Sequence, residues 1–137
     1  MGVLKSTDGG KSWASTAFKW KANEPFWGFR LAVHPTDPSM LLVAATFGLA
    51  RITGGGKAWS YAVKGGGFYD VLFHPANPSI VYAASRNAVY RSTDAGQTWT
   101  QLKPGLPDNP RSDRIRLAVT RASPDLSLIH ISEPTRH

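Results

Sequence analysis

Carboxylates are the side chains of this 137-residue chain with the clearest capacity for chemistry. Hydrolysis by general acid and base needs two of them, held on opposite sides of a cleft. Asp70 is the best single candidate, because it begins a strand-like apolar run that should lie near the centre of the fold. No second carboxylate stands at a matching spacing. We therefore predict no catalytic pair and assign no catalytic residue to this chain.

Asp8 and Asp94 occupy the same place in a repeated octapeptide. Ser-Thr-Asp-Gly-Gly-Lys-Ser-Trp at residues 6–13 (the first box) returns as Ser-Thr-Asp-Ala-Gly-Gln-Thr-Trp at residues 92–99 (the last box). A degenerate copy at residues 52–59 (the middle box) has glycine in place of the aspartate and should form a looser hairpin. Catalysis or metal binding is one interpretation of these carboxylates. We favour a structural one, because such turn carboxylates accept hydrogen bonds from their own backbone.

The box residues with a structural rationale are the hydroxyl and the aspartate, the glycine at the fifth position and the closing tryptophan. That glycine can adopt a positive φ without steric cost, and the tryptophan side chain has a large apolar surface that can pack on the sheet. We assign this structural role to Ser6, Asp8, Gly10, Trp13, Gly56, Trp59, Ser92, Asp94, Gly96 and Trp99.

Two histidines, His34 and His74, each precede a proline in segments 31–39 and 71–79, which match position for position. Two imidazoles one repeat apart lack the clustering that metal ligands need. We expect them to be turn residues, and we predict neither a metal site nor a cofactor.

The elements that position these residues repeat with a period of about 40. Trp59 and Trp99 are 40 residues apart, as are His34 and His74. Between these anchors, short β-rich runs alternate with turn residues. The predicted strands are 30–33, 41–45, 49–53 and 59–63, then 69–73, 80–85, 88–92 and 98–102. Four strands in each unit of about 40 residues is the pattern of a β-propeller blade.

The box resembles the Asp-box, or BNR, repeat of sialidases, sortilin-type ectodomains, xyloglucanase-like glycoside hydrolases and a photosystem II assembly factor. Combined with the His-Pro turns and the run Val-Tyr-Ala-Ala-Ser at Val81–Ser85, it is most similar to sortilin-like propellers of large secreted bacterial proteins. The resemblance covers residues 2–125. It implies a four-stranded blade repeat, of the same general kind as WD40 or YVTN repeats, but no particular activity.

The predicted fold is therefore all-β: a partial propeller made of an incomplete arc of four-stranded antiparallel blades. We expect residues 1–125 to supply half a blade, two full blades and the first strand of another. Residues 126–136 resemble a translated sequencing adaptor, so we expect the segment 126–137 to be a non-native tail. Its alternating apolar pattern could nevertheless let it pair as the second strand of the next blade.

Composition excludes several classes of function. The net charge is +7, but the basic residues are scattered and no nucleic-acid reader motif is present, so we predict no nucleic-acid partner. No apolar run is long enough to span a membrane, and the absence of cysteine leaves no disulfide framework. The resemblance implies a secreted or cell-surface parent protein, whose remaining blades would be partners of this segment.

Turns between the second and third strands should share one end of the propeller with the connections between blades. This end is rich in aromatic residues, and loops on a rigid scaffold commonly carry binding residues. The candidate ligand face comprises Trp20, Trp27, Phe47, Tyr69, Asp70 and Arg86. The alternative is that Phe18, Phe26 and Phe29 pack between blades and only the two tryptophans are partly exposed.

Three hypotheses about function follow. The first is a non-catalytic binding module of a larger secreted protein, with a protein or glycan ligand on the aromatic face. The second is a piece of a xyloglucanase- or sialidase-like glycoside hydrolase whose catalytic residues lie in other blades. The third is a scaffold like the photosystem assembly factor. We favour the first, because no pair of carboxylates in the chain forms a convincing catalytic constellation.

Overall fold

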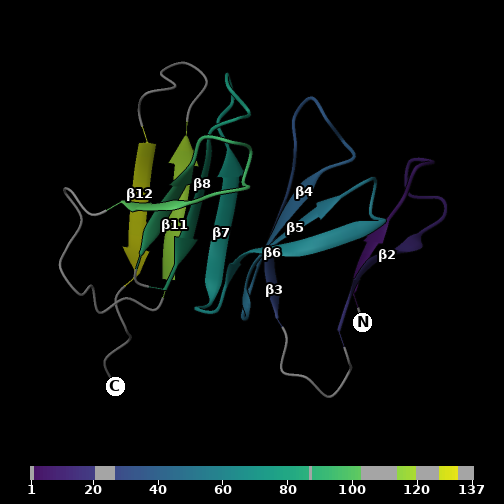
Figure 1. Ribbon diagram of the computed structural model, residues 1–137, viewed down its shortest axis with the longest axis horizontal. Helices are drawn as coiled ribbons and strands as arrows, with labels where there is room; N and C mark the ends of the chain where they lie inside the picture. The colour runs from purple at the N-terminus through teal and green to yellow at the C-terminus, as the bar shows by residue number, and fades with distance from the viewer. Residues whose placement is uncertain (1, 21–26, 87, 103–113, 120–126, 133–137) are drawn as a thin grey trace.

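The computed structural model describes residues 2–20, 27–86, 88–102, 114–119 and 127–132, and these residues form strands and turns only (Figure 1). Across those ranges there is no helix of the length and apolarity needed to cross a membrane. The strands in chain order are β1 (Gly2–Lys5), β2 (Ala14–Lys19), β3 (Gly28–Val33), β4 (Leu41–Ala45), β5 (Gly48–Thr53), β6 (Ala58–Lys64), β7 (Phe68–Phe73), β8 (Val81–Ser85), β9 (Val89–Ser92), β10 (Thr100–Leu102), β11 (Arg114–Val119) and β12 (Ser127–Ser132).

The strands form two four-stranded antiparallel sheets between two hairpins (Figure 1). The first blade has the order β3-β4-β5-β6 and the second the order β7-β8-β9-β10, each with consecutive strands side by side. The predicted eight strands are confirmed, with bounds that differ by two residues at most. The all-β prediction and the arc of four-stranded blades are confirmed with them.

Small and β-branched residues explain why these sheets pack closely. In β4 the run Leu42–Ala45 is buried throughout, and in β8 Val81, Ala83 and Ala84 have no exposed surface. A strand buried on both faces is apolar throughout rather than alternating. The second strand of each blade, β4 or β8, is therefore buried on both faces of its sheet.

Three apolar clusters fill the spaces between neighbouring sheets. The largest lies between the first and second blades and includes Leu42, Leu49, Phe68 and Val71. A second cluster joins the first blade to the β1–β2 hairpin, where Phe18 is buried, and a third joins the second blade to β11. The hydrophobic core is thus a series of interblade layers, and the successive sheets depend on one another for burial.

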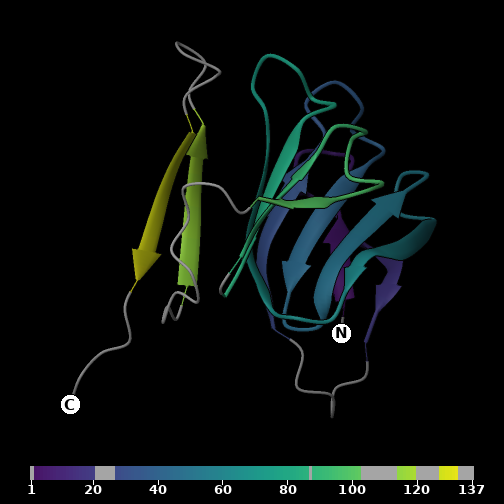
Figure 2. The ribbon, with the colours of Figure 1, turned by 60° about the vertical axis from the view of Figure 1, so that its left-hand side comes forward.

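Hairpins lie at both ends of the row of blades. β1 and β2 pair on either side of the first box, and β11 pairs with β12 from Arg114↔Ser132 to Val119↔Ser127. The prediction that part of the segment 126–137 pairs as a second strand is confirmed by this ladder. Figure 2 shows β11 and β12 as a separate two-stranded ladder beside the second blade.

Candidate functional site

The first and last boxes are closed by their own polar side chains. The Ser92 hydroxyl accepts a hydrogen bond from the Gly96 amide at 2.9 Å, and Asp94 Oδ1 accepts from the Thr98 amide at 2.8 Å. The first box repeats both bonds, from Gly10 to Ser6 and from Ser12 to Asp8. These two carboxylates serve the turns that contain them, which supports the structural interpretation.

Hydrogen bonding changes the acidity of both box carboxyls. The Thr98 hydroxyl and amide, followed by the Ser92 hydroxyl, lower the pKa of Asp94 from 3.8 to about 2. Ser12 and then Ser6 have the same effect on Asp8, whose pKa is also lowered to about 2. In both cases the charged form is favoured because several donors point at it.

We expect the stabilisation from these carboxylates to depend on pH. Because the folded pKa lies below the unfolded one, the contribution is complete above about pH 4 and is lost as the pH falls through about 2. The free-energy difference between the parent chain and a D8N/D94N variant should therefore shrink between pH 5 and pH 2. Urea unfolding at several pH values measures it. A difference that stays constant over this range would contradict the assignment.

The box glycines share one backbone conformation, whereas the box tryptophans differ in exposure. Gly10, Gly56 and Gly96 all have positive φ, between 87° and 100°. The indole N–H groups of Trp13 and Trp99 donate to the carbonyls of Gly10 and Gly96, but Trp99 packs on the interblade core whereas Trp13 is 62% exposed. The middle-box tryptophan, Trp59, is 37% exposed and makes edge contacts with Phe18 and Tyr61.

The His-Pro turns lie at the same end of the blades as the boxes. His74 Nδ1 accepts hydrogen bonds from the Ala76 and Asn77 amides, and His34 Nδ1 accepts from Thr36 and Asp37. Backbone bonds from Gly55 to Ser39 and from Ala95 to Ser79 join each of these turns to the box of its own blade. Both histidines are turn acceptors here. Among the described residues, no group of three or more His, Asp or Glu could hold a metal ion.

The opposite end carries the most exposed aromatic residue of the described ranges, Trp27. Trp27 is 67% exposed, and its backbone is fixed to the β4–β5 turn: the Thr46 amide donates to the Trp27 carbonyl at 3.1 Å, and the Trp27 amide donates to Thr46 Oγ1 at 3.2 Å. Phe47, next in that turn, is 39% exposed, and its carbonyl accepts from the Gly65 amide at 2.8 Å. Three chain segments therefore meet at this end, and we call this surface the aromatic end.

Phe29 and Tyr69 extend the aromatic end towards the second blade. Their ring centroids are 4.7 Å apart at a tilt of 41°, and Phe29 is 36% exposed. Arg86, also exposed, follows β8 as Thr46 follows β4, so it lies at the same end one blade further on. Of the predicted ligand face, Trp27, Phe47, Tyr69 and Arg86 thus occupy one end of the fold.

Trp20 lies in a different environment. It is partly buried, its ring centroid is 5.7 Å from that of Phe18, and it packs against the cluster between the first blade and the β1–β2 hairpin. Phe18 is 2% exposed, so the alternative of packing between blades is confirmed for this phenylalanine. Phe26 lies outside the described residues, and Phe29 is partly exposed in the aromatic end.

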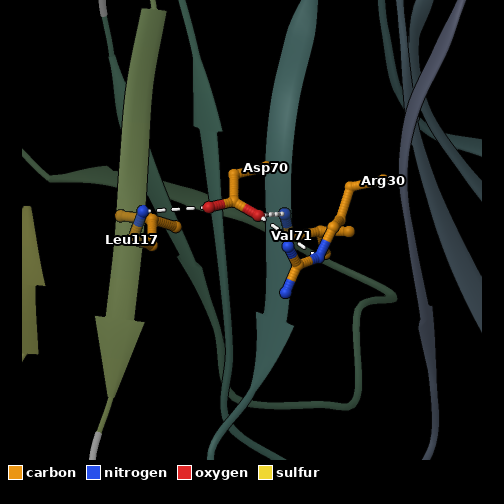
Figure 3. Close-up of polar contacts among 4 residues, drawn as sticks. All are labelled: Arg30, Asp70, Val71 and Leu117. Atoms are coloured by element: carbon orange, nitrogen blue, oxygen red, sulfur yellow. Dashed lines mark hydrogen bonds and ion pairs between the residues drawn. The ribbon is translucent and has the colours of Figure 1, made fainter. Parts of the chain in front are cut away.

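Asp70 is not on an exposed surface, which corrects its placement in the ligand face. Its side chain is 4% exposed, and its two oxygens accept hydrogen bonds from the backbone amides of Val71 at 3.1 Å and Leu117 at 2.9 Å (Figure 3). Arg30 Nε lies 3.7 Å from Oδ1. The carboxylate therefore joins three successive inner strands, β3, β7 and β11, and the sequence interpretation missed this role. The available signal was the repeat alignment, which places Arg30, Asp70 and Arg116 at equivalent positions.

No catalytic pair of carboxylates occurs within the described ranges. Asp8, Asp37 and Asp94 each bond to hydroxyl and amide groups of their own turns, and Asp70 is engaged between blades. Among the described residues, the aromatic end offers aromatic rings for stacking but no carboxylate for acid–base work.

Comparison with solved structures supports the fold. The chain superposes on an ancestral GH74 enzyme with a TM-score of 0.79 at 19% sequence identity, over 93% of this chain and 18% of that one. It thus spans less than one fifth of the length of that enzyme. No protein-family model matches the sequence, and no curated protein matches it. The likeness establishes the β-propeller fold and leaves the activity open.

Proposed function

We propose that this chain is part of a non-catalytic β-propeller module of a larger secreted protein, and that the module binds its ligand at the aromatic end. The observation that supports this most is the exposure of Trp27 on a backbone fixed by two hydrogen bonds to Thr46. An indole that is exposed yet held on a rigid scaffold loses little conformational freedom when a ligand stacks on it.

The chemistry of the aromatic end suits a sugar ring first and an extended peptide second. Trp27 and Phe47 offer exposed ring faces for stacking, and Phe29 and Tyr69 continue the apolar surface. Thr46 and Tyr69, which carry hydroxyls, and Arg86, which carries a guanidinium, lie at the same end. A few polar groups around an aromatic surface are typical of small-ligand sites.

Replacing Trp27 with alanine is expected to weaken binding to an immobilised oligosaccharide by at least about tenfold, because the stacking surface is removed. The test is a screen of the chain against an oligosaccharide array, followed by calorimetric titration of the best ligand. Trp13→Ala is the matched control, since Trp13 is equally exposed but lies at the box end. Equal losses in both variants, or binding only to peptides in a parallel array, would overturn the glycan assignment.

A second candidate is that the parent protein is a glycoside hydrolase, with this chain as a structural arc. The similarity to an ancestral GH74 enzyme supports this alternative. The catalytic carboxylates would then lie outside the described residues. Sequencing the complete locus and assaying the full product for release of reducing sugar distinguishes the two: hydrolysis by the full product, with none by this chain, would favour the enzyme.

A further inference from the structure

The connection between the first and second blades exposes bare backbone at the aromatic end. Residues 65–67 are three successive glycines, which we call the glycine loop, and the Gly65 amide donates to the Phe47 carbonyl at 2.8 Å. A Cβ atom on either of the first two glycines would meet no atom within 4 Å. A Cβ atom on the third would lie 3.8 Å from its nearest neighbours, which belong to Thr46 and Tyr69. The loop therefore runs between aromatic residues with open space beside it.

The glycine loop also carries backbone donors. Within the described part of the chain, the amides of Gly66 and Gly67 donate to no acceptor. Because no side chain stands beside these amides, a ligand group can approach the backbone closely. Successive backbone N–H groups of this kind favour an anion, and a charged acceptor makes the stronger hydrogen bond.

Two cationic side chains flank the glycine loop. Lys64 directly precedes the loop and is exposed. Its Nζ lies 5.9 Å from the centre of the Tyr61 ring, a weak contact that a carboxylate can replace. At the other end of the loop, Phe68 pairs with Ser85, so the exposed Arg86 follows in the chain opposite the last glycine. Positive charge is therefore available on both sides of the bare backbone.

The carboxylates of the described residues lie away from this loop. Asp8, Asp37 and Asp94 belong to turns at the box end, which is the opposite end of the strands. Asp70 lies nearer, but its side chain is 4% exposed and accepts hydrogen bonds from two backbone amides. Within the described ranges, an anion at the glycine loop thus meets two cations and no exposed carboxylate. This charge distribution favours a negatively charged ligand over a neutral one.

We propose that the ligand of the aromatic end is an acidic glycan, a chain of uronic-acid residues whose carboxylates lie on the glycine loop between Lys64 and Arg86. This inference rests on the function proposed above and names the class of ligand. The sugar rings stack on the exposed rings of Trp27 and Phe47. A uronic-acid residue carries its carboxylate on the sugar ring itself, so each residue presents both a stacking face and a negative charge. An acidic peptide divides these two properties between different residues.

Calorimetric titration of the full 137-residue chain with oligogalacturonate and with its methyl ester tests the proposal. The two probes have the same sugar rings, and esterification removes the negative charge. At low salt we expect the acid to bind about tenfold more tightly than the ester, a difference that two exposed ion pairs can supply. The difference should shrink as sodium chloride rises to about 0.5 M, because exposed charges are screened.

A Lys64→Gln/Arg86→Gln variant separates charge from stacking. It should bind the acid and the ester equally, and its affinity for the ester should equal that of the parent chain. Lys11→Gln/Lys57→Gln is the matched control, since it removes two exposed cations at the box end. The control should keep the preference for the acid. A preference that survives in the first variant, or is lost in both, would contradict the role of the two flanking cations.

Substitutions at Gly67 test where the ligand carboxylate lies. Gly67 has no positive φ, and a Cβ there makes only ordinary contacts, so the fold should tolerate both aspartate and the isosteric asparagine. Gly67→Asp should abolish the preference for the acid, because it places a like charge beside the ligand carboxylate. Gly67→Asn should retain the preference. The same preference in both variants would exclude the glycine loop as the carboxylate site.

Failure of this inference differs from failure of the proposed function. Equal affinity for acid and ester, with binding that still depends on Trp27, would overturn the acidic-glycan class and leave the proposed function in place. Binding only to neutral oligosaccharides would have the same meaning. No binding to any oligosaccharide would overturn both. Tighter binding of poly-L-glutamate than of oligogalacturonate would identify the ligand as an acidic peptide instead.

Discussion

Replacing Asp70 with alanine is expected to lower the free energy of unfolding by about 2–4 kcal/mol, because one buried and one partly buried backbone amide lose a charged acceptor. The Val71 amide belongs to the same strand as Asp70, whereas the Leu117 amide belongs to β11, so the loss of the second bond falls on the contact between β7 and β11. Urea unfolding gives the free energy. Hydrogen exchange at the Leu117 amide, which should become much faster than in the parent chain, shows where the loss occurs.

Two variants separate the hydrogen bonds of Asp70 from its ion pair. Arg30→Ala should cost less than about 1 kcal/mol, because the Arg30 side chain is 52% exposed and the 3.7 Å contact is screened by solvent. Asp70→Asn keeps one carbonyl acceptor and should have an intermediate effect. If Arg30→Ala destabilised the chain as much as Asp70→Ala, the ion pair rather than the backbone contact would be the main interaction.

Replacing Gly48 with alanine is expected to cost about 3–5 kcal/mol, which combines backbone strain with steric overlap. Gly48 has a φ of +136°, and a Cβ there would overlap the Val63 carbonyl oxygen and crowd the backbone of residues 64 and 65. The β5–β6 pairing would have to open to relieve the overlap. Thermal unfolding followed by circular dichroism measures the cost.

The same substitution at Gly65 is the control for backbone strain alone. Gly65 has a φ of +85°, but a Cβ there meets no atom within 4 Å. Gly65→Ala should therefore cost only about 1–2 kcal/mol. Equal losses at the two positions would show that steric overlap at Gly48 is relieved at little cost.

Local sequence signals were sufficient for the strands and the blade repeat. The boxes and His-Pro turns carry their own hydrogen-bonding partners within four residues, as the contacts of Asp94 and His74 show. Such turns form in the same way wherever the pattern occurs. The boundary errors fall at strand ends, where Thr98 remains in the turn that Asp94 closes and β10 begins at Thr100.

The side-chain environments could not be predicted in the same way, because they depend on contacts between blades. The sequence places Asp70 at the start of an inner strand but does not show that the Leu117 amide, 47 residues later, will meet its carboxylate. Trp20 and Trp27 are neighbours in an aromatic segment, yet Trp20 packs against the β1–β2 side while Trp27 is fixed to the β4–β5 turn. Proximity in sequence gave no information about this separation.

The middle box has a consequence for the order in which the chain folds. It lacks the aspartate that closes the other boxes, and its carbonyls at Gly55 and Gly56 instead accept hydrogen bonds from Lys5 Nζ and the Ala17 amide. The first and last boxes can form as local turns, but the middle one is completed only when the β1–β2 hairpin has docked against it. During synthesis this hairpin emerges before the middle box and so precedes the loop that needs it. The middle box therefore couples the first blade to the β1–β2 hairpin through two hydrogen bonds that the other boxes replace with contacts inside the turn.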